Sequence, residues 1–362
     1  MLNTIRFSSF LAALLCTGQL QAATLFVPIA NRTDMVYDDI NHTLYVTAGS
    51  TIARYNTQTH QLLSPITIGS GNEGLLGIDI SPDRKTLAIA DAQSTSNNNW
   101  MYLLDTTTNA VTQVSFAKAF GESGTYMPSF SSNGKVLLSS NYAGSGWVPL
   151  RQYDPISGTT NVLGSIRQSS MLTASADRGT IGIAEANEIS APLDRYNVGT
   201  GTIQQWSVDW FAFEMGVSRN GSQFAVPTYG GMYVYDNALH QVGIIGQYAT
   251  NGPIGVVYSP NKDVMYTAWY NQTNSSRQIH EFSATTLQQI GTFDAYGSAS
   301  GSFDWNGNGA LNEGRLKISP DGNLLFATVD GGVSIIDVPE PSTAVLAGVA
   351  FGLVWVVRKR FK

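Results

Sequence analysis

The stretch Leu76-Gly-Ile-Asp-Ile-Ser-Pro-Asp-Arg-Lys-Thr-Leu-Ala-Ile-Ala90 decides the fold, because a turn in its middle separates two apolar segments. Leu76–Ile80 and Thr86–Ala90 have the apolar composition of short buried strands. Ile80-Ser-Pro-Asp83 supplies the turn, since Pro presets the first corner and Asp tolerates the backbone that a turn needs. The pattern predicts an antiparallel hairpin.

This turn recurs along the chain, and a second signature alternates with it. Further copies of the turn are Ser131-Ser-Asn-Gly134, Ala176-Asp-Arg-Gly179, Ser218-Arg-Asn-Gly221, Ser259-Pro-Asn-Lys262 and Ser319-Pro-Asp-Gly322, with Asp39-Ile-Asn-His42 as a weaker first copy. The second signature ends a strand and occurs at Tyr55-Asn56, Leu104-Asp105, Tyr153-Asp154, Tyr196-Asn197, Tyr235-Asp236, Phe282-Ser283 and Ile336-Asp337. Each signature occurs seven times, and successive copies of the second lie 39 to 54 residues apart.

A period of this length with four short strands per unit predicts an all-β fold, a seven-bladed β-propeller of four-stranded blades over residues 23–338. The layout resembles YVTN-type and WD40-like propellers, and Leu44-Tyr-Val-Thr47 is similar to the motif that names the first family. The seventh unit lacks an outer strand, and Thr24–Ile29 is an apolar segment without a blade, so we expect that segment to complete the ring. A pair of β-sandwiches or a solenoid is the alternative.

Both ends of the chain have the composition of export signals. Residues 1–22 are typical of a signal peptide, with Arg6 before an apolar run near Phe7–Cys16 and small residues at Ala22 and Ala23. Residues 343–357 are uncharged and mostly apolar, so we expect a C-terminal transmembrane helix there, followed by a basic tail at 358–362. That tail predicts a cytoplasmic end and a body on the other side of the membrane.

The segment 339–362 resembles the PEP-CTERM sorting signal of Gram-negative bacteria, with Pro339, Glu340 and Pro341 as its motif. The resemblance implies that a signal peptidase and an exosortase act on the protein during export. It also implies a body anchored in the inner membrane and facing the periplasm, then released to the cell surface or outside the cell. Such proteins are typical of organisms that make exopolysaccharide. A membrane anchor that is never cut is the alternative.

Composition limits the partners of the body. The net charge is −6, yet the leader and the segment after Pro341 hold five of the 20 basic residues and no acidic residue. The body is therefore strongly acidic, which argues against nucleic acid as a partner. The only cysteine, Cys16, lies in the leader, so the mature body has neither a disulfide nor a Cys nucleophile.

We expect a ligand at the mouth of the channel, on the face that carries the loops between blades. These loops would bring together Glu73, Tyr126, Glu214, Glu313 and Arg315. Convergent acids can hold a cation or act as acid and base. Solvated charges on the rim are the alternative.

Aromatic residues beside amides occur in the loops between second and third strands, at Trp100, Tyr142, Trp147, Trp269 and Tyr270. Aromatic rings beside amide groups suit sugar binding, because the ring stacks on the C–H face of the sugar while amides bond its hydroxyls. Packing between blades is the alternative for these aromatics.

The longest insertion predicts a calcium ligand set at Asp304, Asn306, Asn308 and Asn312, because the spacing resembles an EF-hand or dockerin-type loop. The twelfth position is Arg315 instead of an acid, so Glu313 would have to substitute. A turn held by side-chain-to-backbone bonds is the alternative.

Enzyme signatures are otherwise missing from the sequence. The histidines His42, His60, His240 and His280 lie in separate units without metal-ligand spacing. We therefore predict an exported, surface-directed propeller that acts as a binding or scaffold module for exopolysaccharide or matrix components. The alternative is a periplasmic enzyme, lactonase-like or lyase-like, that uses acids at the channel mouth.

Overall fold

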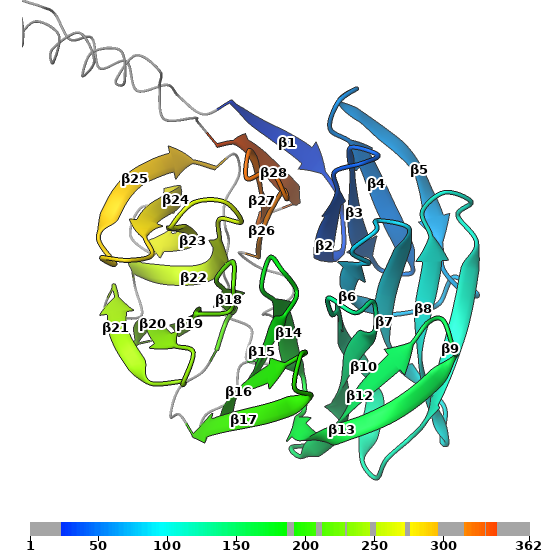
Figure 1. The fold of residues 1–362 in the computed structure, drawn as a ribbon. Coiled ribbons are helices and arrows are strands. Elements are labelled where there is room, and N and C mark those ends of the chain that lie inside the picture. The colour runs from blue at the N-terminus through cyan, green and yellow to red at the C-terminus, as the bar shows by residue number, and fades with distance from the viewer. Residues whose placement is uncertain are drawn as a thin grey trace, which may run out of the picture.

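The computed structural model describes residues 23–186, 192–207, 212–228, 230–246, 251–271, 276–295, 315–329 and 331–338. Within these ranges 28 strands form seven antiparallel sheets of four strands each. The sheets stand around a common centre, each with one strand innermost and one at the rim (Figure 1). The predicted seven-bladed propeller is confirmed.

Blades 1 to 6 follow one another along the chain, each from its innermost to its outermost strand. Blades 1 and 2 consist of β2 (Arg32–Asp38), β3 (Thr43–Ala48), β4 (Thr51–Asn56) and β5 (Gln61–Thr67), and of β6 (Leu75–Ile80), β7 (Thr86–Ser94), β8 (Asn98–Asp105) and β9 (Val111–Ala117). Blades 3 and 4 consist of β10 (Glu122–Phe130), β11 (Val136–Tyr142), β12 (Trp147–Asp154) and β13 (Thr159–Arg167), and of β14 (Ser170–Ala174), β15 (Thr180–Glu185), β16 (Pro192–Asn197) and β17 (Thr202–Ser207). Blades 5 and 6 consist of β18 (Gly216–Val217), β19 (Gln223–Thr228), β20 (Gly231–Asp236) and β21 (Gln241–Ile245), and of β22 (Asn251–Tyr258), β23 (Val264–Asn271), β24 (Ser276–Ser283) and β25 (Gln289–Asp294).

Blade 7 joins the two ends of the propeller. It contains β26 (Leu316–Ile318), β27 (Leu324–Val329) and β28 (Gly332–Asp337), and its outer strand is β1 (Thr24–Pro28). β1 pairs antiparallel with β28 from Thr24 opposite Ile336 to Pro28 opposite Gly332. The predicted closure of the ring by the N-terminal apolar segment is confirmed.

The Ser-containing turns between the first and second strands follow one hydrogen-bond pattern. After β6, Ser81 Oγ donates to Asp83 at 2.6 Å and Arg84 N donates to Ser81 O at 2.9 Å. The same side-chain bond recurs in the turns that start at Ser131, Ser175, Ser259 and Ser319. A short acceptor two residues after Ser is therefore what the repeated motif encodes.

Two copies of this turn start earlier than the sequence predicted. In blade 4 the turn begins at Ser175, not at Ala176, because Ser175 Oγ donates to Asp177 and Arg178 N donates to Ser175 O. In blade 1 Asp38 takes the place of Ser, and its carboxylate accepts bonds from Ile40 N and Asn41 N. The hydrogen bonds, and not the Gly at the end of the motif, therefore define which residue starts each turn.

In blades 1 to 5 the second signature is an Asx turn between the third and fourth strands. Asp105 Oδ1 accepts bonds from Thr107 N and Thr108 N at 2.8 and 2.7 Å, and Asp154 Oδ1 accepts bonds from Ile156 N and Ser157 N. Because consecutive strands are antiparallel, these turns lie on the same face of the ring as the Ser turns. We call this the turn face.

The core lies between the inner three strands of neighbouring blades, and the outer strands face solvent. β3 and β15 are almost entirely buried, whereas most residues of β5 and β9 are exposed. At the junction of blades 7 and 1 the rings of Phe326 and Tyr37 lie 4.9 Å apart. Each blade is thus held by apolar contacts to both neighbours.

The predicted signal peptide, calcium loop, sorting motif, transmembrane segment and basic tail all lie outside the described residues. In the described part of the chain no helix has the length and apolar character needed to cross a membrane.

Candidate functional site: the central channel

The innermost strands place equivalent residues in rings around the channel, and the Ser turns give the register. Residues four positions before the Ser, or before Asp38 in blade 1, form what we call the charged layer: Asp34, Gly77, Met127, Met171, Glu214, Gly255 and Arg315. Residues two positions before it form the polar layer: Val36, Asp79, Ser129, Thr173, Gly216, Val257 and Lys317. The strand pairing supports this alignment, since each polar-layer residue faces the same position of its second strand.

Arg315 is the centre of the charged layer. It precedes β26 in blade 7, and its Nε donates to Asp34 of blade 1 at 2.7 Å. Its Nη1 donates to Glu214 of blade 5, also at 2.7 Å. The Arg315 and Asp34 side chains are fully buried and that of Glu214 is 4% exposed. One guanidinium therefore links three blades through the middle of the ring.

A β-bulge positions Asp34 for this contact. Arg32 pairs with Ala48 and Met35 with Val46, so Thr33 and Asp34 together face Thr47. The backbone of Asp34 is held by Thr47, whose hydroxyl accepts from Asp34 N at 2.9 Å. Such an extra residue redirects the side chains of a strand. Here it leaves the carboxylate between Arg315 and Ile78 N, which donates to it at 3.1 Å.

Burial makes Glu214 the titratable member of the charged layer. Desolvation raises the pKa of Glu214 to about 7, and the attraction of Arg315 offsets it only in part. The pKa of Arg315 is raised, because the nearby carboxylates of Asp34 and Glu214 outweigh its burial. Arg315 is therefore always charged, whereas burial makes Glu214 easier to protonate than an ordinary glutamate.

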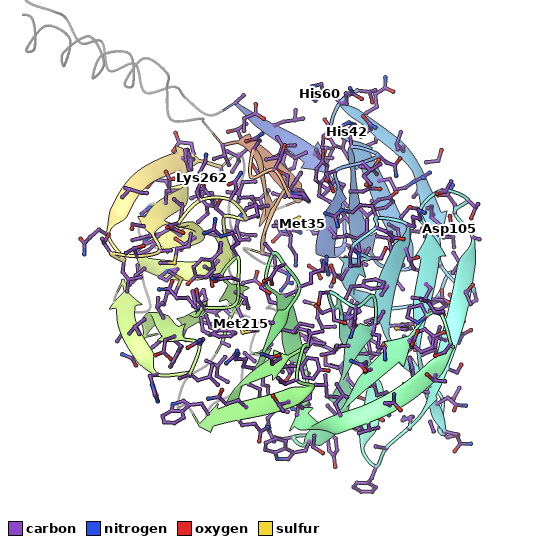
Figure 2. All side chains as sticks on the ribbon, in the orientation of Figure 1. Met35, His42, His60, Asp105, Met215 and Lys262 are labelled. Atoms are coloured by element: carbon purple, nitrogen blue, oxygen red, sulfur yellow. The ribbon has the colours of Figure 1, made fainter. Side chains whose placement is uncertain are left out.

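A cavity of about 240 Å³ extends from Glu214 past the polar layer to the turn face. All seven polar-layer residues line it, as do Arg84, Arg178 and Arg219 from the turns. Met35 and Met215, from the innermost segments of blades 1 and 5, lie beside the centre of the ring, whereas Lys262 lies farther out over blade 6 (Figure 2). Side chains from every blade thus surround one small space.

Asp79 and Arg178 form an ion pair across the mouth of this cavity. Arg178 Nη1 and Nη2 donate to the Asp79 carboxylate at 2.7 and 3.1 Å, and Phe130 N donates to it at 2.7 Å. Burial alone would raise the pKa of Asp79, but Arg178 reverses the effect and the pKa is lowered. Asp79 therefore stays ionised, and Arg178 balances its negative charge.

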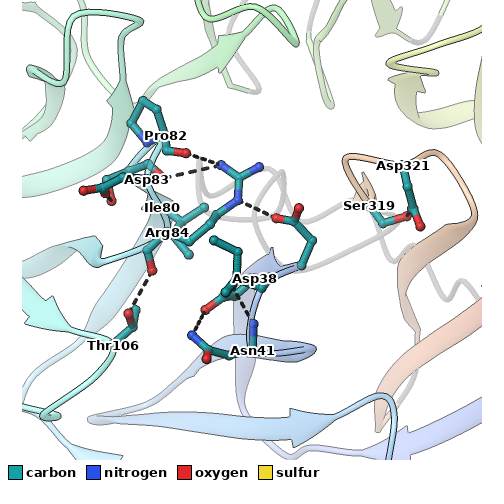
Figure 3. A network of polar contacts seen from close by, with 12 residues as sticks. Asp38, Asn41, Ile80, Pro82, Asp83, Arg84, Thr106, Ser319 and Asp321 are labelled. Carbon is teal, nitrogen blue, oxygen red and sulfur yellow. Dashed lines mark hydrogen bonds and ion pairs between the residues drawn. The ribbon is translucent and has the colours of Figure 1, made fainter.

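Arg84 anchors the mouth on the side of blades 1 and 2. Its Nε donates to Asp39 at 2.5 Å, and its Nη1 donates to Pro82 O at 3.2 Å (Figure 3). Arg84 and Arg178 have positive φ angles of 62° and 55° in turn positions where other blades have Gly. A side chain at such a position costs backbone energy, which the ion pairs of the two guanidinium groups offset in part.

The structure brings together only part of the predicted ligand mouth, and the described cavity opens on the turn face, opposite the face that carries the loops between blades. Glu214 and Arg315 meet in the charged layer, and Tyr126 is fully buried close to them, where burial raises its pKa. Glu73 lies apart, on an exposed loop where its carboxylate accepts from Ser70 N and Gly71 N. Glu313 lies outside the described residues.

Asp34 was missed by the sequence analysis, although a signal for it exists. Once the blades are aligned on Asp38 and the Ser residues, Asp34 occupies the position of Glu214 and Arg315. Complementary charges at one repeat position predict an ion pair across the channel.

The candidate aromatic residues have different environments. Trp100 donates from Nε1 to Asp91 at 2.7 Å, and Trp269 stacks on His280 with ring centroids 4.4 Å apart. Trp147 is half exposed, with the Arg167 guanidinium 5.8 Å from its ring. Tyr142 is half-buried, and the side chain of Tyr270 lies outside the described set.

Contrary to the sequence-based prediction, the four histidines do not all lie in separate blades. His42 and His60 both lie in turns of blade 1, and His240 lies 3.7 Å from Asp236 in blade 5. Within the described ranges no three His, Cys, Asp or Glu side chains gather as metal ligands. The predicted calcium ligands Asp304, Asn306, Asn308 and Asn312 are outside those ranges.

Solved structures with this fold share little sequence with the chain. Hydrazine synthase of Kuenenia stuttgartiensis is 11% identical, with a TM-score of 0.63 over 87% of this chain and 97% of that one. A chain of the mitotic checkpoint complex is 12% identical, with a TM-score of 0.64 over 94% of this chain and 100% of that one. These likenesses show the WD40-like propeller fold alone. Neither a protein family nor a curated protein matches the sequence.

Proposed function

We propose that this protein is an exported propeller that binds exopolysaccharide or matrix components and does not catalyse a reaction. The propeller fold is consistent with a binding or scaffold module. The observation that carries the proposal is that the described acids of the channel are bound to arginines. Asp34, Asp79 and Glu214 are all bound to arginines, so they hold the ring together and leave the cavity for recognition.

The export part of the proposal is supported by the two ends of the sequence. Residues 1–22 have the pattern of a signal peptide, and residues 339–362 resemble a PEP-CTERM tail. We expect a signal peptidase and an exosortase to process the chain and the body to reach the cell surface or the medium.

Two measurements test this function. The purified protein should bind at least one polysaccharide on a glycan array, and repeating the array with a calcium chelator tests the predicted calcium loop. The intact mass of the secreted protein should lack the leader and everything from about Pro341 onward. Binding to no glycan would remove the carbohydrate function, and a mass that retains residues 358–362 would contradict processing.

An enzymatic role is the second candidate, because Glu214 lines the cavity and burial raises its pKa to about 7. A carboxyl group with such a pKa can act as acid or base at neutral pH. A lyase would cleave a polysaccharide, and a lactonase would hydrolyse a lactone. Glu214→Gln would abolish either activity. Unchanged turnover in that variant would exclude Glu214 as the catalytic group.

A further inference from the structure

The polar layer contains a cation, Lys317, that forms no direct ion pair with any described residue. Lys317 is half-buried, and no carboxylate of the described residues lies within 4 Å of its ammonium group. The only acid of that layer, Asp79, is already neutralised by Arg178. Asp79 and Glu214 attract Lys317 only at longer range. Its ammonium group has no direct ion pair among the described residues, so an anion in the channel can bind it.

Hydroxyl groups lie in the same layer as Lys317. Thr173 Oγ1 is buried and has no hydrogen-bond partner among the described residues, and Ser129 is the neighbouring member of the ring. Buried hydroxyls nearly always have a partner in native proteins. The layer therefore offers polar contacts to a ligand that itself carries hydroxyl groups.

Basic side chains outnumber acidic ones among the described residues that line the cavity. Arg84, Arg178, Arg219 and Lys317 line it, against Asp79 and Glu214. The three arginines have ion-pair partners, since Arg84 binds Asp39, Arg178 binds Asp79 and Arg219 lies 3.5 Å from Asp263. Lys317 is therefore the cation of this lining that remains for a small anion entering the channel.

The size of the cavity limits the ligand. A volume of 240 Å³ corresponds to about eight water molecules, which is close to the space that a single sugar ring needs. We propose that the channel binds one hydroxylated carboxylate of monosaccharide size, such as a uronic acid, with the carboxylate on Lys317 and a hydroxyl on Thr173. This inference rests on the proposed glycan-binding function and names its ligand class.

Calorimetric titration with D-glucuronate tests the inference, with D-glucose and propionate as probes that lack the carboxylate and the hydroxyls. We expect glucuronate to bind at least 10-fold more tightly than either probe. Lys317→Met should weaken glucuronate binding by 10-fold or more, because a charge-assisted hydrogen bond is lost. Lys317→Arg should keep most of the affinity, since the positive charge remains.

Lys262→Met is the control, because it removes a lysine of the neighbouring blade 6. Lys262 lies in the Ser turn of that blade and does not line the cavity. It should bind glucuronate like the wild type, and urea unfolding verifies that every variant is folded. Equal affinity of wild type and Lys317→Met, or equal affinity for glucose and glucuronate, would overturn the inference.

The same titration shows whether the ligand is the end of a polysaccharide or a free sugar acid. It also separates failure of this ligand class from failure of the proposed glycan-binding function. Tighter binding of a tetraglucuronate than of the monomer indicates the end of an acidic polysaccharide, and the reverse indicates a free sugar acid. Failure of glucuronate to bind, together with a positive glycan array, contradicts this ligand class and leaves the proposed function standing. Failure of both rejects both.

Discussion

The two layers of the channel lie two residues apart along the innermost segment of each blade, yet they use charge in opposite ways. In the charged layer Arg315 is fully buried and bound to Asp34 and Glu214. In the polar layer Lys317 is half-buried and has no carboxylate within 4 Å among the described residues. Because Arg315 is buried and paired, its charge has a structural role. Because Lys317 is partly exposed and has no direct ion pair among the described residues, its charge is available to a ligand.

Side-chain volume explains why the open space lies mainly in the polar layer. The charged layer holds the long side chains of Arg315, Glu214, Met127 and Met171, with Gly77 and Gly255 between them. The polar layer holds mainly short side chains, and the cavity passes through it. The comparison predicts that substitutions in the charged layer change stability, whereas those in the polar layer change binding.

Arg315→Met should give the largest effect on stability. The variant leaves Asp34 and Glu214 buried without their cation, which typically costs about 3–5 kcal/mol. The loss should appear as a lower midpoint in urea unfolding with an unchanged slope. Lys262→Met is the control and should shift stability by less than about 0.5 kcal/mol. An equal midpoint for Arg315→Met and wild type would show that the charged layer does not hold the ring.

Glu214→Gln should change how stability depends on pH. The folded pKa of about 7 is above the ordinary value of 4.5, so folding favours the protonated form. The stability that Glu214 contributes is fully present below about pH 4.5 and is lost as pH rises through 7. Relative to the variant, the wild type should lose about 3 kcal/mol between pH 4.5 and 8.5. Parallel pH profiles in urea unfolding would mean that Arg315 keeps Glu214 charged.

Gly77→Ala tests whether the charged layer is filled. A Cβ at Gly77 would lie 2.9 Å from Met127 Cα, which is backbone and cannot move aside easily. Overpacking of this kind costs about 2 kcal/mol in the free energy of unfolding. Gly179→Ala is the matched control, since its Cβ would meet only the Asp177 side chain at 3.4 Å. A similar, small cost for both variants would indicate spare room in the layer.

Sequence reasoning gave the ring and its closure but only part of the site. The Ser and Asx turns are local, so their residues reveal the repeat and the strands between them. Contacts across the channel are not local, because Arg315 and Asp34 are 281 residues apart. Their proximity follows only from an alignment of the blades, and the bulge that directs Asp34 leaves no clear mark in the sequence. Glu73 was assigned to the mouth because its loop connects two blades, yet that loop lies on the face opposite the turn face, and its carboxylate bonds its own loop.

Lys317→Met should give the smallest change in stability, which completes the contrast with Arg315. Lys317 has no ion-pair partner among the described residues, so its loss leaves no uncompensated charge of the kind that Arg315→Met creates. The midpoint of urea unfolding should shift by less than about 0.5 kcal/mol, although Met replaces a charge that lies inside the ring. A loss as large as that of Arg315→Met would show that Lys317 is also structural. The polar layer would then hold blade 7 in place, and the cavity would have no free cation with which to bind an anion.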